Sequence, residues 1–423
     1  MFEKIAQIWK VKDLRNSILY ILGMLVIFRF AAHVPIPGVN MDNLREFFQS
    51  NQILGLLNLF SGGGMQNFSI VMLGVAPYIT SSIIFQLLAM IVPKLEEMSK
   101  DEGGRQKISM YTRLATVPLA ALQGYGMLNI LSRSSQPIIQ STDLFSMFTM
   151  ILTITAGTVF LMWIGELISE KKIGNGISLL IFAGIIAGVP QALQQTFINF
   201  SKDQLMTLVV FAVIAVVTIV GVVIITEGQR KIPVSYAKRV RGNKMYGGTN
   251  THLPVKVNQA GVIPIIFAIS IVLFPSMVAQ FMVRAETEFV AKTGQFVIDL
   301  FANQVFYAVL YFLLVFGFTY FYTAVIFHPN QIADNLQKSG AFIPGIRPGK
   351  NTEEYLQNTI SRITLTGALF LALIAVMPLM LQNTMGMQSM VIGGTSILIV
   401  VSVVIETIKQ IDSQMTMREY DGI

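Results

Sequence analysis

Residues able to do chemistry are few in this chain, and their spacing matches no common catalytic or metal-binding pattern. The three histidines, His33, His252 and His328, lie far apart and form no HExxH or similar ligand motif. Cysteine is absent, which excludes thiolate metal sites, cysteine nucleophiles and disulfides. The glycine-rich run at 345–350 has the wrong spacing for a phosphate-binding loop, and Asn351 follows where Ser or Thr is needed. The sequence therefore predicts no enzyme activity, no metal site and no cofactor.

The charged residues Arg29, Arg113 and Glu166 lie within otherwise apolar runs, near the ends of those runs. A charge at the centre of a membrane helix marks a functional site by default, whereas long side chains near helix ends can reach the interface. We therefore expect these three side chains to extend toward the membrane surface. Because no apolar run carries a carboxylate at its middle, proton-coupled or sodium-coupled transport lacks its usual residues.

Apolar runs of about 18 to 25 residues dominate the chain. Of its 423 residues, 53% are hydrophobic and 13% are charged, whereas ordinary soluble proteins carry about 25% charged residues. Lipid accepts such a chain when each backbone polar group is bonded internally, and uninterrupted runs of this length indicate helices instead of barrel strands. The predicted fold class is an all-α polytopic membrane protein with ten transmembrane helices. The expected spans are residues 16–34, 68–92, 110–131, 144–168, 176–197, 206–226, 259–283, 304–327, 363–382 and 390–408.

The ten expected spans divide into an N-terminal half, residues 1–200, and a C-terminal half, residues 201–423. Because each half has an odd number of spans, the second half would enter the membrane with the opposite orientation, which permits two pseudo-symmetric inverted halves with a substrate path between them. Most of the 30 Lys and Arg residues fall in the N-terminus, in every second loop and in the C-terminal tail. Basic residues accumulate on the cytoplasmic side, so both termini are expected in the cytoplasm. The stretch before residue 16 is too polar for a signal peptide, so we expect the first helix to be retained.

One apolar segment is too short to span. Residues 53, 56, 57 and 60 share a helical face, and the segment would rise about 12 Å, whereas the hydrocarbon core measures about 30 Å. The run Gly62, Gly63 and Gly64 follows it and would act as a hinge. The pattern alone leaves open a mobile stopper and a static surface helix. The apolar residues of the segment are Ile53, Leu54, Leu56, Leu57, Leu59 and Phe60.

Two long loops on the predicted cytoplasmic side carry basic residues. The loop at 227–258 holds two strand-like runs around a glycine turn, which indicates a hairpin, and its acid-free basic run suits a polyanion such as ribosomal RNA. The loop at 328–362 places basic residues on a turn fixed by proline and glycine. The basic residues of the first loop could also serve only to orient the chain in the membrane, and the second loop could be an ordinary solvated turn. The candidate docking residues are Lys238, Arg239, Arg241, Lys244, Arg347 and Lys350.

A series of motifs, in order from the first predicted span to the tenth, resembles one protein family. They are VPIPG at 34–38, APYI at 76–79, GNGIS at 174–178, YAKR at 236–239, THLP at 251–254, AGVIP at 260–264, PGIRPG at 344–349 and GGTS at 393–396. By these motifs the chain is similar to the SecY family, the channel subunits of the bacterial general secretory translocon.

The resemblance implies that two five-helix halves enclose an hourglass pore and part sideways between the second and third helices on one side and the seventh and eighth on the other. An aliphatic neck in that pore would disfavour water and ions yet spread around a sliding polypeptide. The short helix would be the plug of the pore. Polar side chains along the lateral seam would hydrogen-bond in the closed state, although they could equally be ordinary contacts between helices. The implied neck residues are Val75, Ile79, Ile181, Ile266 and Ile399, and the seam residues are Thr80, Gln86 and Gln123.

The resemblance also implies what the chain acts on and with. Unfolded secretory proteins would cross the plasma membrane through it, and membrane proteins would leave it sideways into lipid. Its implied partners are the subunits SecE and SecG, the ATPase SecA, the ribosome, signal peptides and nascent polypeptides. The alternatives are a secondary transporter of small solutes, which needs midplane polar ligands that the spans lack, and a receptor or scaffold, which needs no aliphatic neck.

Overall fold

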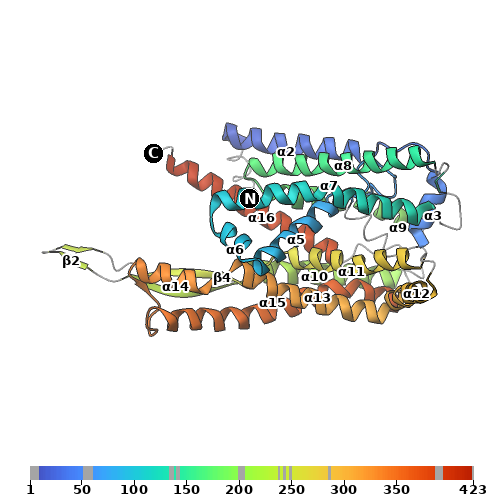
Figure 1. Ribbon diagram of the computed structural model, residues 1–423. Coiled ribbons are helices and arrows are strands. Elements are labelled where there is room, and N and C mark those ends of the chain that lie inside the picture. The colour runs from blue at the N-terminus through green and yellow to red at the C-terminus, as the bar shows by residue number, and fades with distance from the viewer. Residues whose placement is uncertain are drawn as a thin grey trace. The chain divides into compact units, whose positions relative to one another are not determined.

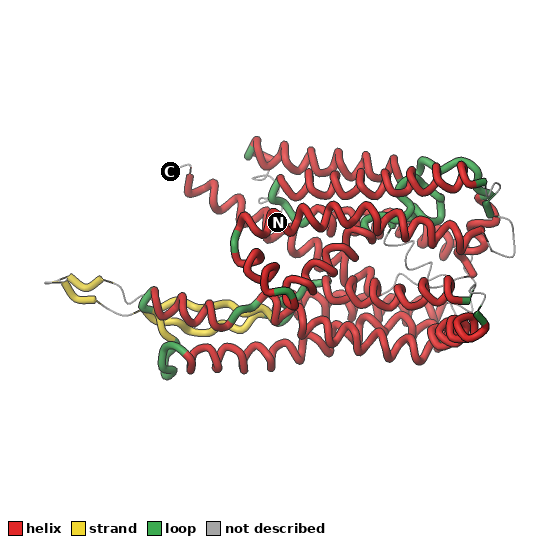
Figure 2. Tube along the Cα trace, viewed as in Figure 1, coloured by secondary structure: helices red, strands yellow, loops and turns green. Residues whose placement is uncertain are grey.

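The computed structural model describes residues 9–50, 61–132, 138–139, 143–198, 205–236, 239–241, 244–246, 250–283, 287–385 and 394–421. These residues are mainly helical, with strands confined to a small β-arm (Figure 1; Figure 2). Each of the ten expected spans contains a helix. The chain forms two compact units, which we call unit 1 (residues 1–201, 274–295 and 403–423) and unit 2 (residues 202–273 and 296–402).

Unit 1 is built around a central helix, α7, that packs against α5, α6 and α8. Helix α8 also packs against α9, and α2 packs against both α8 and α9. Proline stands at the start of α5 and of α6, where its missing N–H leaves no bond unmade, and the two helices are bent by 105°. The helices are α2 (Lys12–Ala31), α3 (Met41–Ser50), α5 (Ala76–Ile91), α6 (Pro93–Lys100), α7 (Glu102–Ser132), α8 (Leu144–Glu170) and α9 (Gly176–Ile198).

The second expected span, 68–92, was wrong at its N-terminal end. Residues 61–75 form a series of turns, and the helix begins only at Ala76. Phe68 has φ +42° and Gly74 has φ +58°, values that a right-handed helix does not contain. Phe68 has no exposed surface, so burial of its ring offsets the cost of this backbone conformation.

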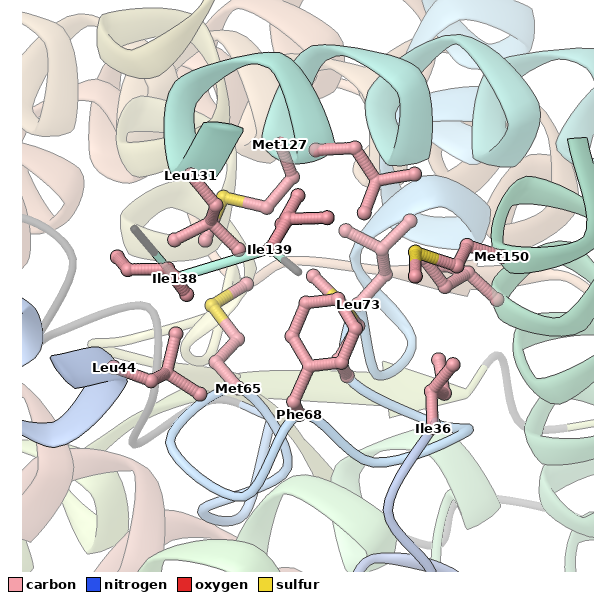
Figure 3. Close-up of a cluster of buried hydrophobic side chains, with 13 residues drawn as sticks. Ile36, Leu44, Met65, Phe68, Leu73, Met127, Leu131, Ile138, Ile139 and Met150 are labelled. Atoms are coloured by element: carbon pink, nitrogen blue, oxygen red, sulfur yellow. The ribbon is translucent and has the colours of Figure 1, made fainter. Parts of the chain in front are cut away.

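The turns at 61–75 form one side of an apolar core (Figure 3). Met65, Phe68 and Leu73 from the turns meet Met127 and Leu131 near the end of α7. Close packing of this kind fixes the turn segment, since each displaced side chain would leave a cavity. The other buried members of the core are Ile36, Leu44, Met72, Leu128, Ile138, Ile139, Met150 and Ile154.

Unit 2 is built on two long helices, α13 and α15, that pack along each other, with α10 and α14 against α15. Asn303 begins α13 by accepting hydrogen bonds from the N–H groups of Val305 and Phe306. The helices that unit 2 contains or shares with unit 1 are α10 (Leu205–Glu227), α11 (Ile263–Met282), α12 (Glu288–Ala302), α13 (Gln304–Ile326), α14 (Pro329–Lys338), α15 (Lys350–Met385) and α16 (Gly394–Asp421). Of these, α11, α12 and α16 contribute residues to both units.

The loop expected at 328–362 was wrong in part, because much of it is helical. Helix α14 begins at Pro329, and α15 extends about a dozen residues N-terminal of the ninth expected span. The polar composition of these stretches hid them from a search for apolar runs, and their apolar residues instead line a small core in unit 2.

Several helices can cross a membrane. Within the described residues, six stretches are long and apolar enough, or seven if α5 and α6 are counted as one bent span. Two shorter apolar helices, Gly176–Pro190 and Ile263–Val272, lie within α9 and α11. The chain is thus a multi-pass membrane protein, whereas the count of ten spans and the inverted relation of residues 1–200 to 201–423 stay predictions.

Candidate functional site

The β-arm of unit 2 confirms the hairpin expected at 227–258. Strand β1 (Gln229–Tyr236) pairs antiparallel with β4 (Asn250–Lys256), and Ile232 lies opposite Leu253. Between them in sequence, β2 (Arg239–Arg241) pairs with β3 (Lys244–Tyr246), with Arg241 opposite Lys244. The hairpin therefore carries a second, basic hairpin as its tip.

The two long loops form one body, which the sequence did not predict. Strand β5 (Ala341–Phe342), from the second loop, pairs with β1 so that Ser235 lies opposite Phe342. Beneath this three-stranded sheet, Ile232 and Val255 of the first loop pack with Ile343, Leu356 and Ile360 of the second. A two-residue strand has no periodicity to detect, so only the folded chain reveals this pairing.

Five of the six predicted docking residues lie on this body or on its tip. Arg347 and Lys350 are exposed, and Gly345 and Gly349 adopt φ +81° and +97°, which favour glycine. The carbonyl of Arg347 accepts a hydrogen bond of 3.1 Å from the Thr352 hydroxyl, so the backbone of the turn is fixed while the guanidinium is free to meet a partner. Three further docking residues lie on the tip strands, namely Arg239, Arg241 and Lys244, whereas Lys238 lies outside the described residues.

The five predicted neck residues are all within helices or at a helix start. In unit 1, Val75 precedes the first residue of α5 and is buried, Ile79 follows one turn later and is half-buried, and Ile181 is buried in α9. In unit 2, Ile266 is half-buried in α11 and Ile399 is fully buried in α16. A ring would join side chains of both units, so it is argued below as a proposal.

The predicted seam residues bond mainly within their own helix. Thr80 donates to the carbonyl of Ala76 at 3.0 Å, and Gln86 donates to the Ser82 hydroxyl at 3.0 Å, both inside α5. Gln123 is half-buried in α7. Thr80 and the Gln86 amide thus find partners inside α5, which leaves a role at a seam as a prediction.

The plug residues Ile53, Leu54, Leu56, Leu57, Leu59 and Phe60 lie outside the described residues, but the glycine run after them is described. Gly62 is buried at φ +68°, and a Cβ there would lie 2.9 Å from both the Gly184 Cα and the Phe28 ring. Gly64 is crowded by Ser61 and Ser69, whereas Gly63 has open space around it. Two of the three glycines are therefore required by close packing.

Arg29, Arg113 and Glu166 have protein partners, which the sequence did not predict. Arg29 of α2 donates to the carbonyl of Gly62 at 2.5 Å. Arg113 of α7 forms an ion pair with Glu166 of α8. A basic and an acidic residue in successive apolar runs is the signal that could have predicted the second pair, whereas no sequence signal marks the first. Each contact supplies a partner for a charge that lipid would not solvate.

The crowding at Gly62 gives a test with a built-in control. Gly62→Ala should cost more than Gly63→Ala, because both positions have positive φ but only the first meets backbone within 3 Å. We expect the free energy of unfolding to fall by about 1–2 kcal/mol at Gly63, and by about 1–3 kcal/mol more at Gly62. Thermal unfolding of the two purified variants measures this difference. Equal midpoints would show that the contact between Gly62 and Gly184 is loose.

Comparison with known proteins identifies the family. A model of the SecY family matches residues 69–408 of this chain. The SecY subunit of the protein translocase from Mycobacterium bovis is 42% identical, over 97% of this chain and 97% of its own.

Solved structures of low sequence identity share the fold. A SecY protein, whose plug domain stabilises the closed state of its translocation channel and maintains a membrane seal, matches with a TM-score of 0.60 at 17% identity, over 93% of this chain and 90% of its own. Sec61 in the canine ribosome–channel complex matches with a TM-score of 0.57 at 15% identity, over 93% of this chain and 90% of its own. Taken with the close match in sequence, the chain belongs to the SecY family and is a subunit of a protein-conducting channel.

Proposed function

We propose that Val75, Ile79, Ile181, Ile266 and Ile399 form the neck of this channel, through which unfolded secretory proteins pass. The observation that carries the function is the family match, which spans all five positions. All five side chains are aliphatic, and each is buried or half-buried. An apolar constriction excludes water when it is empty, and it offers a sliding polypeptide no polar group to bind. The same property therefore seals the closed channel and lets polypeptides of different sequence pass.

Around this neck, ten spanning helices would be arranged as two inverted five-helix halves, residues 1–200 and 201–423. The channel would lie in the plasma membrane, with both termini in the cytoplasm. Thr80, Gln86 and Gln123 would lie along the seam that opens to release membrane proteins sideways into lipid. Their position on α5 and α7, the helices of the second and third expected spans, supports this assignment.

The segment from Ile53 to Phe60 would be the plug that closes the neck. Support comes from the similar SecY protein, whose plug domain maintains a membrane seal. The hinge expected at Gly62, Gly63 and Gly64 is limited to fewer residues, because Gly62 and Gly64 are closely packed and only Gly63 of the three has open space. The plug would therefore turn about Gly63 or about residues before Gly62.

The body formed by the two long loops would be the docking surface for SecA and for the ribosome. The contact between the loops supports a single platform, since Arg347 and the basic tip at Arg239, Arg241 and Lys244 both extend from it. The similar Sec61 comes from a complex with a ribosome. SecE and SecG would complete the channel, with signal peptides and nascent polypeptides as its cargo.

A secondary transporter of small solutes has no support from these relatives, which are named as translocase subunits and channels. The family comprises channel subunits and indicates no enzyme activity of the chain itself.

Site-specific crosslinking tests the polypeptide path. A photoreactive residue at position 79 or 266 should crosslink to a secretory chain that is arrested during translocation. Val213 in α10 is the control, because its side chain is exposed on the surface of the chain and should yield little product. Equal crosslinking from position 213 and from the two neck positions would contradict the neck assignment.

A further inference from the structure

The C-terminal part of α16 is bound to the loop between α8 and α9 by two glutamine side chains. The Oε1 atom of Gln410 accepts a hydrogen bond of 2.5 Å from the N–H of Gly174. The Nε2 atom of Gln414 donates one of 2.9 Å to the carbonyl of Lys172. The two glutamines are one helical turn apart, so they lie on the same face of α16. We call these two bonds the glutamine clamp.

The loop that receives the clamp has a rigid and specific shape. Lys172 is one of two non-glycine residues with positive φ among the described residues, at +57°, and Gly174 has φ +84°. Asn175 accepts a hydrogen bond from the Ser178 N–H, and the Ser169 hydroxyl accepts one from the Gly176 N–H. The clamp thus bonds two backbone groups whose directions are already fixed, and it need not order the loop itself.

Gly174 allows α16 to approach closely. A Cβ at this position would lie 3.1 Å from the Thr407 hydroxyl and 3.0 Å from Leu179. Thr407 is on the same face of α16 as the two glutamines, about one turn before Gln410. Three side chains along this face of α16 therefore lie against the same loop. A chance surface contact would not need three aligned side chains.

Helix α16 is shared between the two units. Its first residues, Gly394–Ser402, belong to unit 2, whereas Val403 onward belong to unit 1, where the clamp lies. Ile399 is three turns before Gln410 on the same helix. Because a helix bends little over three turns, holding residues 407–414 restricts the direction of the turn that bears Ile399.

We propose that Gln410 and Gln414 are positioning residues that hold α16 in the resting state of the channel, so that release of the clamp loosens the neck. The proposal rests on the proposed function, because it acts through Ile399. Both bonds of the clamp lie within unit 1, on the same helix that carries Ile399 three turns earlier. Loss of either bond makes the resting position of α16 less favoured by about fivefold.

The opposite roles of the two glutamines give a reciprocal test. Gln410 acts as an acceptor, so Gln410→Glu should keep its bond and Gln410→Lys should lose it. Gln414 acts as a donor, so Gln414→Lys should keep its bond and Gln414→Glu should lose it. Because Gln410 also contacts Glu406, the Gln410→Glu variant is made together with Glu406→Gln to avoid repulsion between two carboxylates.

The measurement is the resting ion conductance of the reconstituted channel complex, together with export of a precursor that has a defective signal sequence. We expect Gln410→Lys and Gln414→Glu to raise conductance about fivefold and to export the defective precursor. The two bond-keeping variants should stay within about twofold of wild type. If both Glu variants behave alike and both Lys variants behave alike, charge and not the clamp is responsible, and the proposal is overturned.

Thermal unfolding of the same variants tests whether the clamp has a purely structural role. If the bond-breaking variants lower the thermal midpoint but leave conductance unchanged, the clamp only stabilises the fold and the proposal fails. Ile399→Asn is measured in parallel. A leak in that variant without a leak in the clamp variants overturns the clamp alone, whereas no leak in any variant overturns the neck and the clamp together.

Discussion

Ile399→Asn is expected to raise the resting ion conductance of the reconstituted channel by about tenfold or more. The Ile399 side chain has no exposed surface, so asparagine would place an amide in apolar surroundings where it lacks partners. An unpaired buried amide costs about 1–3 kcal/mol, and entry of water into the neck would relieve that cost. Since about 1.4 kcal/mol corresponds to a factor of ten, the wetted and conducting state becomes correspondingly more populated. Planar bilayer recordings measure the change.

The matched control for this prediction is Val404→Asn. Val404 lies on the same helix but is 37% exposed, so an amide there would not wet the neck. Deletion of Ile53 to Phe60 should also raise the conductance, because it removes the proposed plug. Wild-type conductance in Ile399→Asn, or an equal rise in Val404→Asn, would show that Ile399 is an ordinary core residue.

Arg347→Glu is expected to lower SecA-driven export by more than tenfold while the channel still folds and inserts. The side chain is exposed on a turn whose backbone is fixed by Gly345, Gly349 and the Thr352 hydroxyl, so reversal of its charge should not disturb the fold. If an acidic group of SecA faces Arg347, the glutamate at this position would repel it, and such a pair of like charges costs several kcal/mol of binding free energy. Export of a secretory precursor into inverted membrane vesicles measures the effect.

Lys338→Glu is the control for the docking prediction. Lys338 is exposed at the end of α14, in the same region between α13 and α15, but outside the proposed docking set. The Lys338→Glu substitution changes the net charge by the same amount as Arg347→Glu and should leave export within about twofold of wild type. Equal losses in both variants would indicate a general requirement for positive charge, and normal export in Arg347→Glu would remove the docking role.

Sequence reasoning succeeded where one local signal was enough. The hairpin at β1 and β4 was predicted because its two strand-like runs flank a glycine turn, and that prediction was confirmed. The apolar runs located a helix in each expected span, since about twenty apolar residues in succession have few alternatives to a buried or membrane helix. The family motifs, which led to the channel function, are likewise contiguous stretches of a few residues.

Sequence reasoning failed where a residue depends on a distant partner. Residues 68–75 were expected to be helical, because Phe68 and its neighbours are as apolar as a span. Their packing against α7 decides otherwise. The partner of Arg29 is 33 residues away in Gly62, and the partner of Gln410 is 236 residues away in Gly174.

The amino-acid sequence by itself determined that this chain lies in a membrane as many helices, that it has no cysteine chemistry, and that its basic charge is concentrated in loops and tails. These properties follow from composition and order, because lipid selects apolar length and orientation selects basic loops. Only the tertiary structure decided which polar groups in apolar helices have partners, that the two long loops form one body, and that α16 is bound to the loop between α8 and α9. Such contacts join segments that are far apart in the chain, and their energies depend on distances of a few ångströms that no local pattern encodes.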